Sequence, residues 1–171
     1  MYASHESSRD PVRPEVEADW DNLGSPETYL GTERTRNFVS RDGLSPGQAY
    51  TYAAPDRLRV NDWALTGAWT AEAESVFSSA PNGRISIRFH ARDVNLVMGP
   101  KEAGEPVAFR VSIDGEPPRA AFGSDADAEG AGPLDEQRMY QLVRQQGPVA
   151  DRTFEIEFVD RGAEAFAFTF G

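Results

Sequence analysis

Apolar and polar residues alternate along several short segments of this chain. The clearest is residues 107–114, and the same period recurs in residues 84–91, 154–158 and 166–170. Alternation of this kind places successive side chains on opposite faces of a β-strand, so each segment is predicted to bury one face and expose the other. Weaker strand candidates are residues 63–69, 94–98 and 139–144.

The end of the chain carries two specific expectations. Phe166, Phe168 and Phe170 share one parity and are predicted to form a single buried face of the last strand. The segment DRGAE before them contains Gly162, which tolerates a positive φ angle. These residues predict a short hairpin turn between the last two strands.

Turn residues separate the predicted strands. Clusters of glycine, proline and aspartate recur between them, and no long stretch follows the helical period of about 3.6 residues. Many short strands joined by such turns are typical of antiparallel sandwiches. The chain is therefore predicted to be all-β, an antiparallel β-sandwich.

Residues 1–24 differ from the rest of the chain, being polar, acidic and proline-containing with no apolar period. They are predicted to be a flexible leader or linker. Residues 25–171 are predicted to form a single domain, since this length suffices for one substantial core. No apolar stretch approaches the roughly 20 residues of a membrane helix, so no direct membrane insertion is expected. Residues 1–20 also lack the apolar segment of a signal peptide.

Charge and cysteine content exclude some functions. The chain has 28 acidic and 17 basic residues, for a net charge of −11. General nucleic-acid binders neutralise phosphates with Lys and Arg, so nucleic acid is not expected as a partner. There are no cysteines. Disulfides, thiolate metal sites and thiol redox chemistry are therefore excluded for this chain itself.

Candidate catalytic residues are few. A Ser-His-Asp triad requires a histidine as base, and the chain contains only His5 and His90. His5 lies in the polar leader, and no nucleophile motif accompanies His90. The chain is therefore predicted not to be an enzyme.

A cationic stripe is predicted on one strand. Arg88, His90 and Arg92 alternate with apolar residues and are expected to project from the same face. Tyr140 and Arg144 are predicted to join them from a neighbouring strand. Two interpretations stay open: a solvated polar face balanced by nearby acids, or a surface that hydrogen-bonds a polar ligand such as a glycan.

Two tryptophans also allow two interpretations. Trp63 and Trp69 share the parity of Leu65, so an unbroken strand places all three on one face. Core packing is the commoner fate of such side chains. The alternative is a sugar-stacking platform, in which an indole ring contacts the C–H face of a pyranose, and Tyr140 is a similar candidate.

The acidic loop DADAEGAGPLDE is the best candidate for a metal site. The carboxylates at calcium-template positions are Asp125, Asp127, Glu129 and Glu136. The loop departs from the template by a proline at a ligand position and by the absence of convincing flanking helices. No cofactor is therefore expected, with calcium at these carboxylates as the alternative.

Four separated strings give the chain a family resemblance. They are SPETYLGTERTRNF, RFHARDVNLVMGP, RMYQLVRQQGPVADRTFEIEF and EAFAFTFG, spread between residues 25 and 171. In this order they resemble the C-terminal domain of DipZ-like thioredoxin fusion proteins. In that family a membrane-embedded electron-transfer part is followed by an extracytoplasmic thioredoxin-like domain and then by this domain.

The resemblance implies a fold and a role. It implies a carbohydrate-binding-module-like β-sandwich, or jelly roll, in which residues 25–38 are the junction with a preceding thioredoxin-like domain. It implies a non-catalytic accessory module on the extracytoplasmic side that recognises a glycan or a protein client for its thioredoxin-like partner. The alternative is a structural or protein-interaction domain that docks on the thioredoxin-like domain and has no sugar site.

Overall fold

The computed structural model describes residues 17–171, and the part of the expected leader before residue 17 lies outside this range. It contains 11 β-strands and two short 3₁₀ helices, and every pairing between the named strands is antiparallel. The strands are β1 (Thr28–Tyr29), β2 (Ala49–Tyr52), β3 (Trp63–Ala71), β4 (Val76–Ser78), β5 (Gly83–Phe89), β6 (Asp93–Pro100), β7 (Val107–Ile113), β8 (Ala131–Leu134), β9 (Arg138–Arg144), β10 (Arg152–Phe158) and β11 (Ala163–Phe170). The helices are η1 (Trp20–Asn22) and η2 (Arg119–Ala121). The prediction of an all-β antiparallel sandwich is confirmed.

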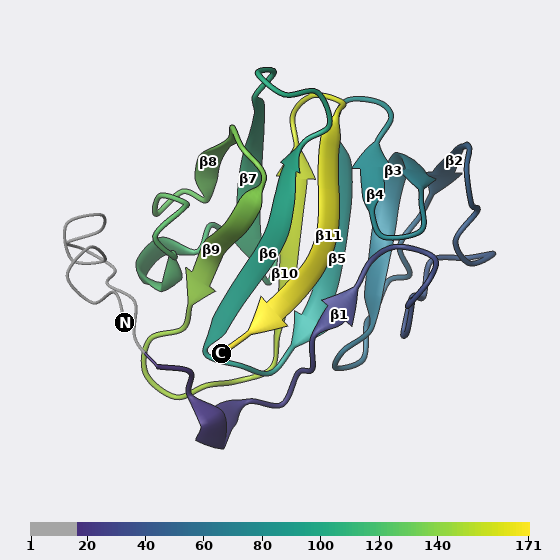
Figure 1. Cartoon of the computed structure of the whole chain (residues 1–171). Helices are drawn as coiled ribbons and strands as arrows, with labels where there is room; N and C mark the ends of the chain where they lie inside the picture. Colours follow the sequence, from purple (N-terminus) through teal and green to yellow (C-terminus); the bar gives the residue numbers. More distant parts are fainter. Residues whose placement is uncertain (1–16) are drawn as a thin grey trace.

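The strands form one curled sheet that folds into two layers (Figure 1). We call the layer β2-β3-β4-β11-β6-β9, with β1 beside β11, the front sheet. The layer β8-β7-β10-β5-β3 is the back sheet. In Figure 1, β9, β6 and β11 lie in front of β7, β10 and β5. No helix in residues 17–171 is long and apolar enough to cross a membrane.

Strand β3 belongs to both layers. Its first half pairs with β5 of the back sheet, and its second half pairs with β2 and β4 of the front sheet. Gly67 stands at the change of partner with a φ of 92°, a conformation that glycine adopts without steric cost. Both tryptophans of β3, Trp63 and Trp69, remain fully buried together with Leu65. Core packing is therefore confirmed for these tryptophans, and their interpretation as a sugar-stacking platform is wrong.

The core lies between the inner faces of the two sheets. Phe154 of the back sheet meets Phe168 of the front sheet edge to face, with ring centroids 5.6 Å apart. Phe109 and Tyr140 make a second contact between the layers at 6.2 Å. Aromatic pairs in this geometry are favourable beyond the area they bury. Alternation therefore had the expected consequence for β5, β7 and β10, because their large apolar residues face this core or its margin.

The last strand differs from its prediction at one residue. β11 has a register shift against β6 between Ala165 and Ala167, which leaves Phe166 without a partner in the ladder. A bulge of this kind inserts one extra residue and changes the parity of everything after it. Phe168 is fully buried and Phe170 packs against the core, whereas Phe166 is only half-buried. The expectation that all three phenylalanines share one buried face is therefore wrong for Phe166.

The turn before β11 is not a hairpin. β10 pairs with β5 and β7 in the back sheet, whereas β11 pairs with β1, β4 and β6 in the front sheet. The connection therefore carries the chain from one layer to the other. Gly162 has the expected positive φ, at 93°, but its amide donates to Ser78 and its carbonyl accepts from Lys101. A short glycine turn alone does not show whether the strands beside it pair with each other.

The segment 25–38 packs along the front sheet. β1 pairs with β11, Leu30 is fully buried, and its amide donates to the carbonyl of Phe166. At Gly31 a Cβ atom would lie 2.3 Å from the carbonyl oxygen of Ala73, so only glycine fits there. The residues just before this segment are also in contact with the domain, because the amide of Gly24 donates to the carbonyl of His90 at 2.7 Å.

Candidate functional site

The outer face of the back sheet is an ordered array of polar side chains, which we call the polar array. Alternation turns these side chains outward, and the strand register places them opposite one another. The facing pairs are Thr153 with Arg88, Glu155 with Ser86, Glu157 with Arg84, Glu155 with Ser112, and Glu157 with Arg110. Hydrogen-bond donors and acceptors therefore alternate across β5, β10 and β7.

One segment forms a roof over part of this array. Residues 54–58 line an open cleft of about 490 Å³ together with residues of β5 and β10. The side of the cleft formed by the strands consists of Ser86, Arg88, Thr153 and Glu155. Ligand sites in proteins are typically clefts of roughly 300–1,000 Å³ with a few converging polar groups. The volume of the cleft is within this range, and several polar groups line it.

One of the two acids that line the cleft, Glu155, already has partners. The Ser86 hydroxyl donates to Glu155 Oε1 at 3.2 Å, and Arg84 Nη1 lies 3.6 Å from Glu155 Oε2. Arg88 Nη1 donates to the Thr153 hydroxyl at 3.0 Å, and no carboxylate within residues 17–171 forms an ion pair with Arg88. The cleft therefore contains a half-buried guanidinium group, that of Arg88, whose charge is not balanced by an ion pair.

A second hollow, of about 380 Å³, lies at the other end of the sandwich, near residues 77–79 and 101–105. Lys101 Nζ lies there at 3.1 Å from Glu72 Oε1 and 3.7 Å from Glu164 Oε2, and at 4.5 Å from the centre of the Phe77 ring. The ammonium group is thus already surrounded by protein partners. Glu102, Glu105 and Arg161 also line this hollow.

The predicted cationic stripe does not continue from Arg88 to its other members. His90 follows the end of β5, and its Nδ1 lies 2.7 Å from Asp151 Oδ1. Arg92 binds both carboxylate oxygens of Asp93 at 3.0 Å, and its Nη2 also donates to the carbonyl of Glu17 at 2.7 Å. Hydrogen bonding to Asp93 raises the pKa of Arg92. Nearby acids therefore balance both side chains.

Arg144 belongs to the same acidic centre as Arg92. Its Nε and Nη2 donate to the two oxygens of Asp93 at 2.9 and 3.1 Å. Asp93 is 6% exposed, so one buried carboxylate is shared by two guanidinium groups. This geometry is the bidentate one that arginine favours. Arg144 contributes to fixing β6 on β9 at this end of the front sheet.

Tyr140 is part of the core. Its ring is fully buried, and its hydroxyl donates to the carbonyl of Glu136 at 2.7 Å while accepting from the amides of Asp135 and Glu136 at 3.2 Å. Burial raises the pKa of this phenol. The guanidinium carbon of Arg138 lies 3.8 Å from the ring centre. No face of Tyr140 is exposed for a sugar to stack on.

The expectation that Tyr140 and Arg144 lie on a strand next to Arg88 is wrong. β5 pairs with β3 and β10, whereas β9 pairs with β6 in the other layer. Of the predicted ligand residues, Arg88 lines the cleft, and sequence reasoning missed its neighbours Ser86, Thr153 and Glu155. Their outward parity was visible in the sequence. Their position opposite one another was not, because register depends on which strands pair.

The carboxylates of the acidic loop are used within the protein. Asp125 accepts from the amide of Gln141 at 2.8 Å and lies 3.1 Å from Arg138 Nη2. Asp127 accepts from the amides of Glu129 and Ala131. In the part of the chain that the structure describes, no three His, Cys, Asp or Glu side chains gather as a metal site requires. Calcium binding by this loop stays a prediction.

The chain is similar to two curated relatives. They are Protein DipZ of Mycobacterium bovis and Protein DipZ of Mycobacterium tuberculosis, each 28% identical over 147 residues. The match covers 86% of this chain and 18% of each relative, so the chain corresponds to about a fifth of their length. The family model described as "Thioredoxin like C-terminal domain" matches residues 25–171. This match covers the whole sandwich, and the chain belongs to the family of thioredoxin-like C-terminal domains.

Proposed function

We propose that this accessory domain recognises a glycan for a thioredoxin-like partner and that it binds the glycan in the cleft on the back sheet. The observation that carries the proposal is the roofed cleft, in which hydroxyl, carboxylate and guanidinium groups converge from two paired strands. A sugar presents hydroxyl groups that both donate and accept hydrogen bonds. Donors and acceptors arranged side by side match that chemistry.

The roof adds an apolar contribution to the cleft. Pro55 and Leu58 line the cleft together with the charged residues Asp56 and Arg57. A pyranose ring has polar edges and apolar C–H faces, so a cleft with one polar wall and some apolar surface suits it. The role proposed is recognition without catalysis, carried out by this domain on the extracytoplasmic side.

Glycan binding is tested with the purified 171-residue chain on a broad glycan array, followed by calorimetric titration of the retained sugars. Thr153→Val removes a hydroxyl from the cleft and is expected to weaken binding about 3–10-fold, the equivalent of a hydrogen bond of about 0.5–1.5 kcal/mol. Thr169→Val removes a hydroxyl from the front sheet and is the matched control, with no expected effect. Failure of the chain to retain any glycan would contradict the proposal.

A second function is favoured by the outer face of the front sheet, which we call the neutral face. Its registered outward residues are Met139, Val97, Ala167 and Tyr29 in one row and Gln141, Asn95 and Thr169 in the next. None of them is charged, although the chain has a net charge of −11. Protein interfaces are depleted of charge at their centre and enriched in Tyr and Met.

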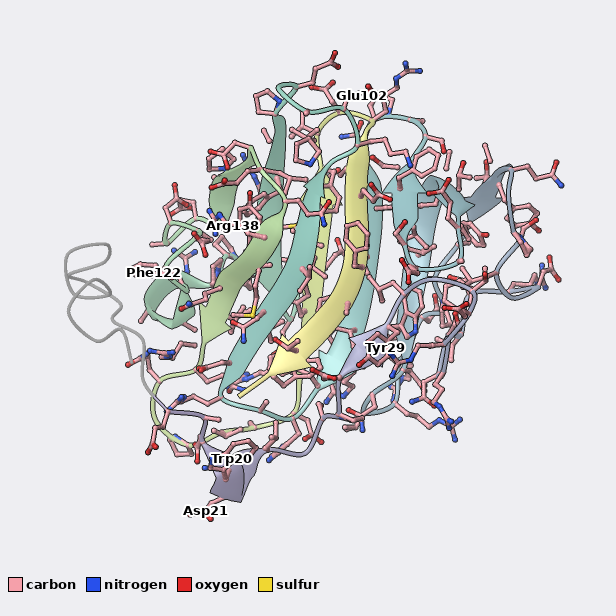
Figure 2. All side chains as sticks on the ribbon, in the orientation of Figure 1. Trp20, Asp21, Tyr29, Glu102, Phe122 and Arg138 are labelled. Carbon is pink, nitrogen blue, oxygen red and sulfur yellow. The ribbon has the colours of Figure 1, made fainter. Side chains whose placement is uncertain are left out.

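The neutral face is open in the structure. No other strand lies in front of β9, β6 and β11 in Figure 1, although the Arg34 guanidinium carbon lies 3.7 Å from the centre of the Tyr29 ring. In Figure 2, Tyr29 lies beside β11, and Arg138 lies at the β9 edge of this sheet. Met139, in the first of the two rows, is 44% exposed. A face of this composition suits docking on a thioredoxin-like domain, and this is the second candidate function.

Docking is tested by pull-down with the purified thioredoxin-like domain of mycobacterial DipZ. Met139→Arg places a charge on the neutral face and is expected to abolish retention, because an unpaired charge in an interface is costly. Ser112→Arg makes the same change on the back sheet and is the control. Equal retention of both variants would exclude the neutral face as the docking surface.

A further inference from the structure

We propose that the cleft on the back sheet selects a glycan that carries a carboxylate, such as a uronic-acid unit, and that Arg88 binds this carboxylate. The inference rests on the glycan recognition proposed above and specifies the chemical class of the ligand. It follows from the position of one half-buried cation, from its unused hydrogen-bonding capacity, and from the charges around it.

Arg88 differs from the other half-buried arginines in residues 17–171 because it has no ion pair with an acid. The half-buried arginines among residues 17–171 are Arg88, Arg92, Arg138 and Arg144. Arg92 and Arg144 share Asp93, and Arg138 pairs with Asp125 at 3.1 Å. Removal of a cation from water is unfavourable unless an anion or several hydrogen bonds replace the water. Arg88 is partly removed from water without such an anion.

The hydrogen bonds of Arg88 leave most of its donors unused. A guanidinium group has five N–H donors, and that of Arg88 makes a single hydrogen bond within residues 17–171, to the Thr153 hydroxyl. Because Thr153 accepts in this bond, its own hydroxyl proton remains available to a ligand. A carboxylate in the cleft would accept two parallel N–H bonds from Arg88, the geometry that makes arginine selective for carboxylates.

Two acids near Arg88 are held by other protein groups. Glu155 is engaged by Ser86 and Arg84. Asp62 lies beside Arg88 across the strand pair, because the Arg88 amide donates to the Asp62 carbonyl. The Asp62 carboxylate, however, accepts from the Arg59 amide at 2.9 Å and lies 3.7 Å from Arg59 Nε. Neither carboxylate is free to rotate onto Arg88 without losing its own partners.

The local charge does not oppose an anion here. The cleft is lined by two arginines and two acids, Arg57, Arg88, Asp56 and Glu155, with Arg84 next to Glu155. The lining is therefore close to neutral, while the whole chain carries −11. An anionic ligand meets less repulsion in this cleft than a surface with the average charge of the chain would impose.

The test compares two oligosaccharides by calorimetric titration of the full chain. One is an oligouronate, and the other is the same oligosaccharide after reduction of every carboxylate to a primary alcohol. The oligouronate is expected to bind at least tenfold more tightly, with the difference shrinking as salt is added. Arg88→Gln should abolish the preference, whereas Arg110→Gln on the same face should keep it. Thermal melts check that both variants are folded.

The possible results separate this inference from the proposed function. Equal affinity for the two oligosaccharides would overturn carboxylate selection and leave glycan recognition standing. Absence of binding to either of them, and to the whole glycan array, would overturn both. Binding of a peptide through its terminal carboxylate, with no binding of oligouronate, would overturn the glycan assignment and give Arg88 a peptide ligand instead.

Discussion

The two outer faces of the sandwich have opposite chemistry, although both are formed by alternating strands. The polar array on the back sheet places arginine, glutamate, serine and threonine opposite one another beneath a roof. The neutral face on the front sheet has no charged residue in its two registered rows. Outward parity therefore fixes only that a side chain faces away from the core. The charge and polarity of the outward side chains distinguish the surface proposed for a small ligand from the surface proposed for docking.

The two sheets also differ in how their charges are neutralised. The front sheet contains one buried ion-pair centre, where Asp93 is shared by Arg92 and Arg144. On the back sheet, the ion pairs are exposed, as for Arg152 and Asp114, whose side chains are 44% and 41% exposed. Loss of one partner destabilises a buried ion pair more than an exposed one. Mutations at the Asp93 centre are therefore expected to lower the free energy of unfolding more than mutations at the exposed pair.

The largest expected loss of stability comes from a mutation in the core, which lies between the two sheets. Phe168→Ala is predicted to lower the free energy of unfolding by about 3–5 kcal/mol, through lost burial and the cavity left behind. Phe166→Ala is the matched control at the bulge and is predicted to cost about 1 kcal/mol, since its ring is outside the core. Equilibrium urea unfolding measures both. Equal costs would mean that the bulge does not separate the two rings.

The next effect compares the buried and exposed ion pairs. Asp93→Asn is predicted to cost about 2–3 kcal/mol in unfolding free energy, because two partly buried guanidinium groups lose their shared anion. Asp114→Asn removes an exposed carboxylate from the back sheet and is predicted to cost less than about 1 kcal/mol. Urea unfolding at low and high salt distinguishes them. If Asp114→Asn lowered the free energy of unfolding as much as Asp93→Asn, the proposed difference between the ion pairs of the two sheets would be wrong.

The smallest effect concerns the acidic loop, which lies outside both faces. Asp125 and Asp127 already bind protein groups, so calcium is expected to leave the thermal melting curve unchanged. Melts in millimolar calcium and in chelator provide the measurement. A higher melting temperature with calcium would show that the native state binds the ion, since a ligand specific for the native state must stabilise it. That result would establish the calcium site that the sequence suggested.

Local pattern accounts for much of what was predicted correctly. The segments around Phe89, Val111 and Ile156 became strands with buried apolar faces, because alternation of side chains is a property of each strand by itself. The weaker candidates at residues 63–69 and 139–144 also lie within strands. Even the outward direction of Arg88 follows from its parity with buried neighbours.

The sequence by itself indicated seven of the eleven strands, the buried parity of most of them and the all-β class. Tertiary structure decided that the chain crosses layers after β10, that Phe166 lies at a bulge, and that residues 54–58 cover the back sheet. It also decided the partners, placing Thr153 opposite Arg88 and Arg144 opposite Asp93. The physical reason is that strand pairing joins residues far apart in the chain. Register and partner are set by the packing of all strands together, which no single segment encodes.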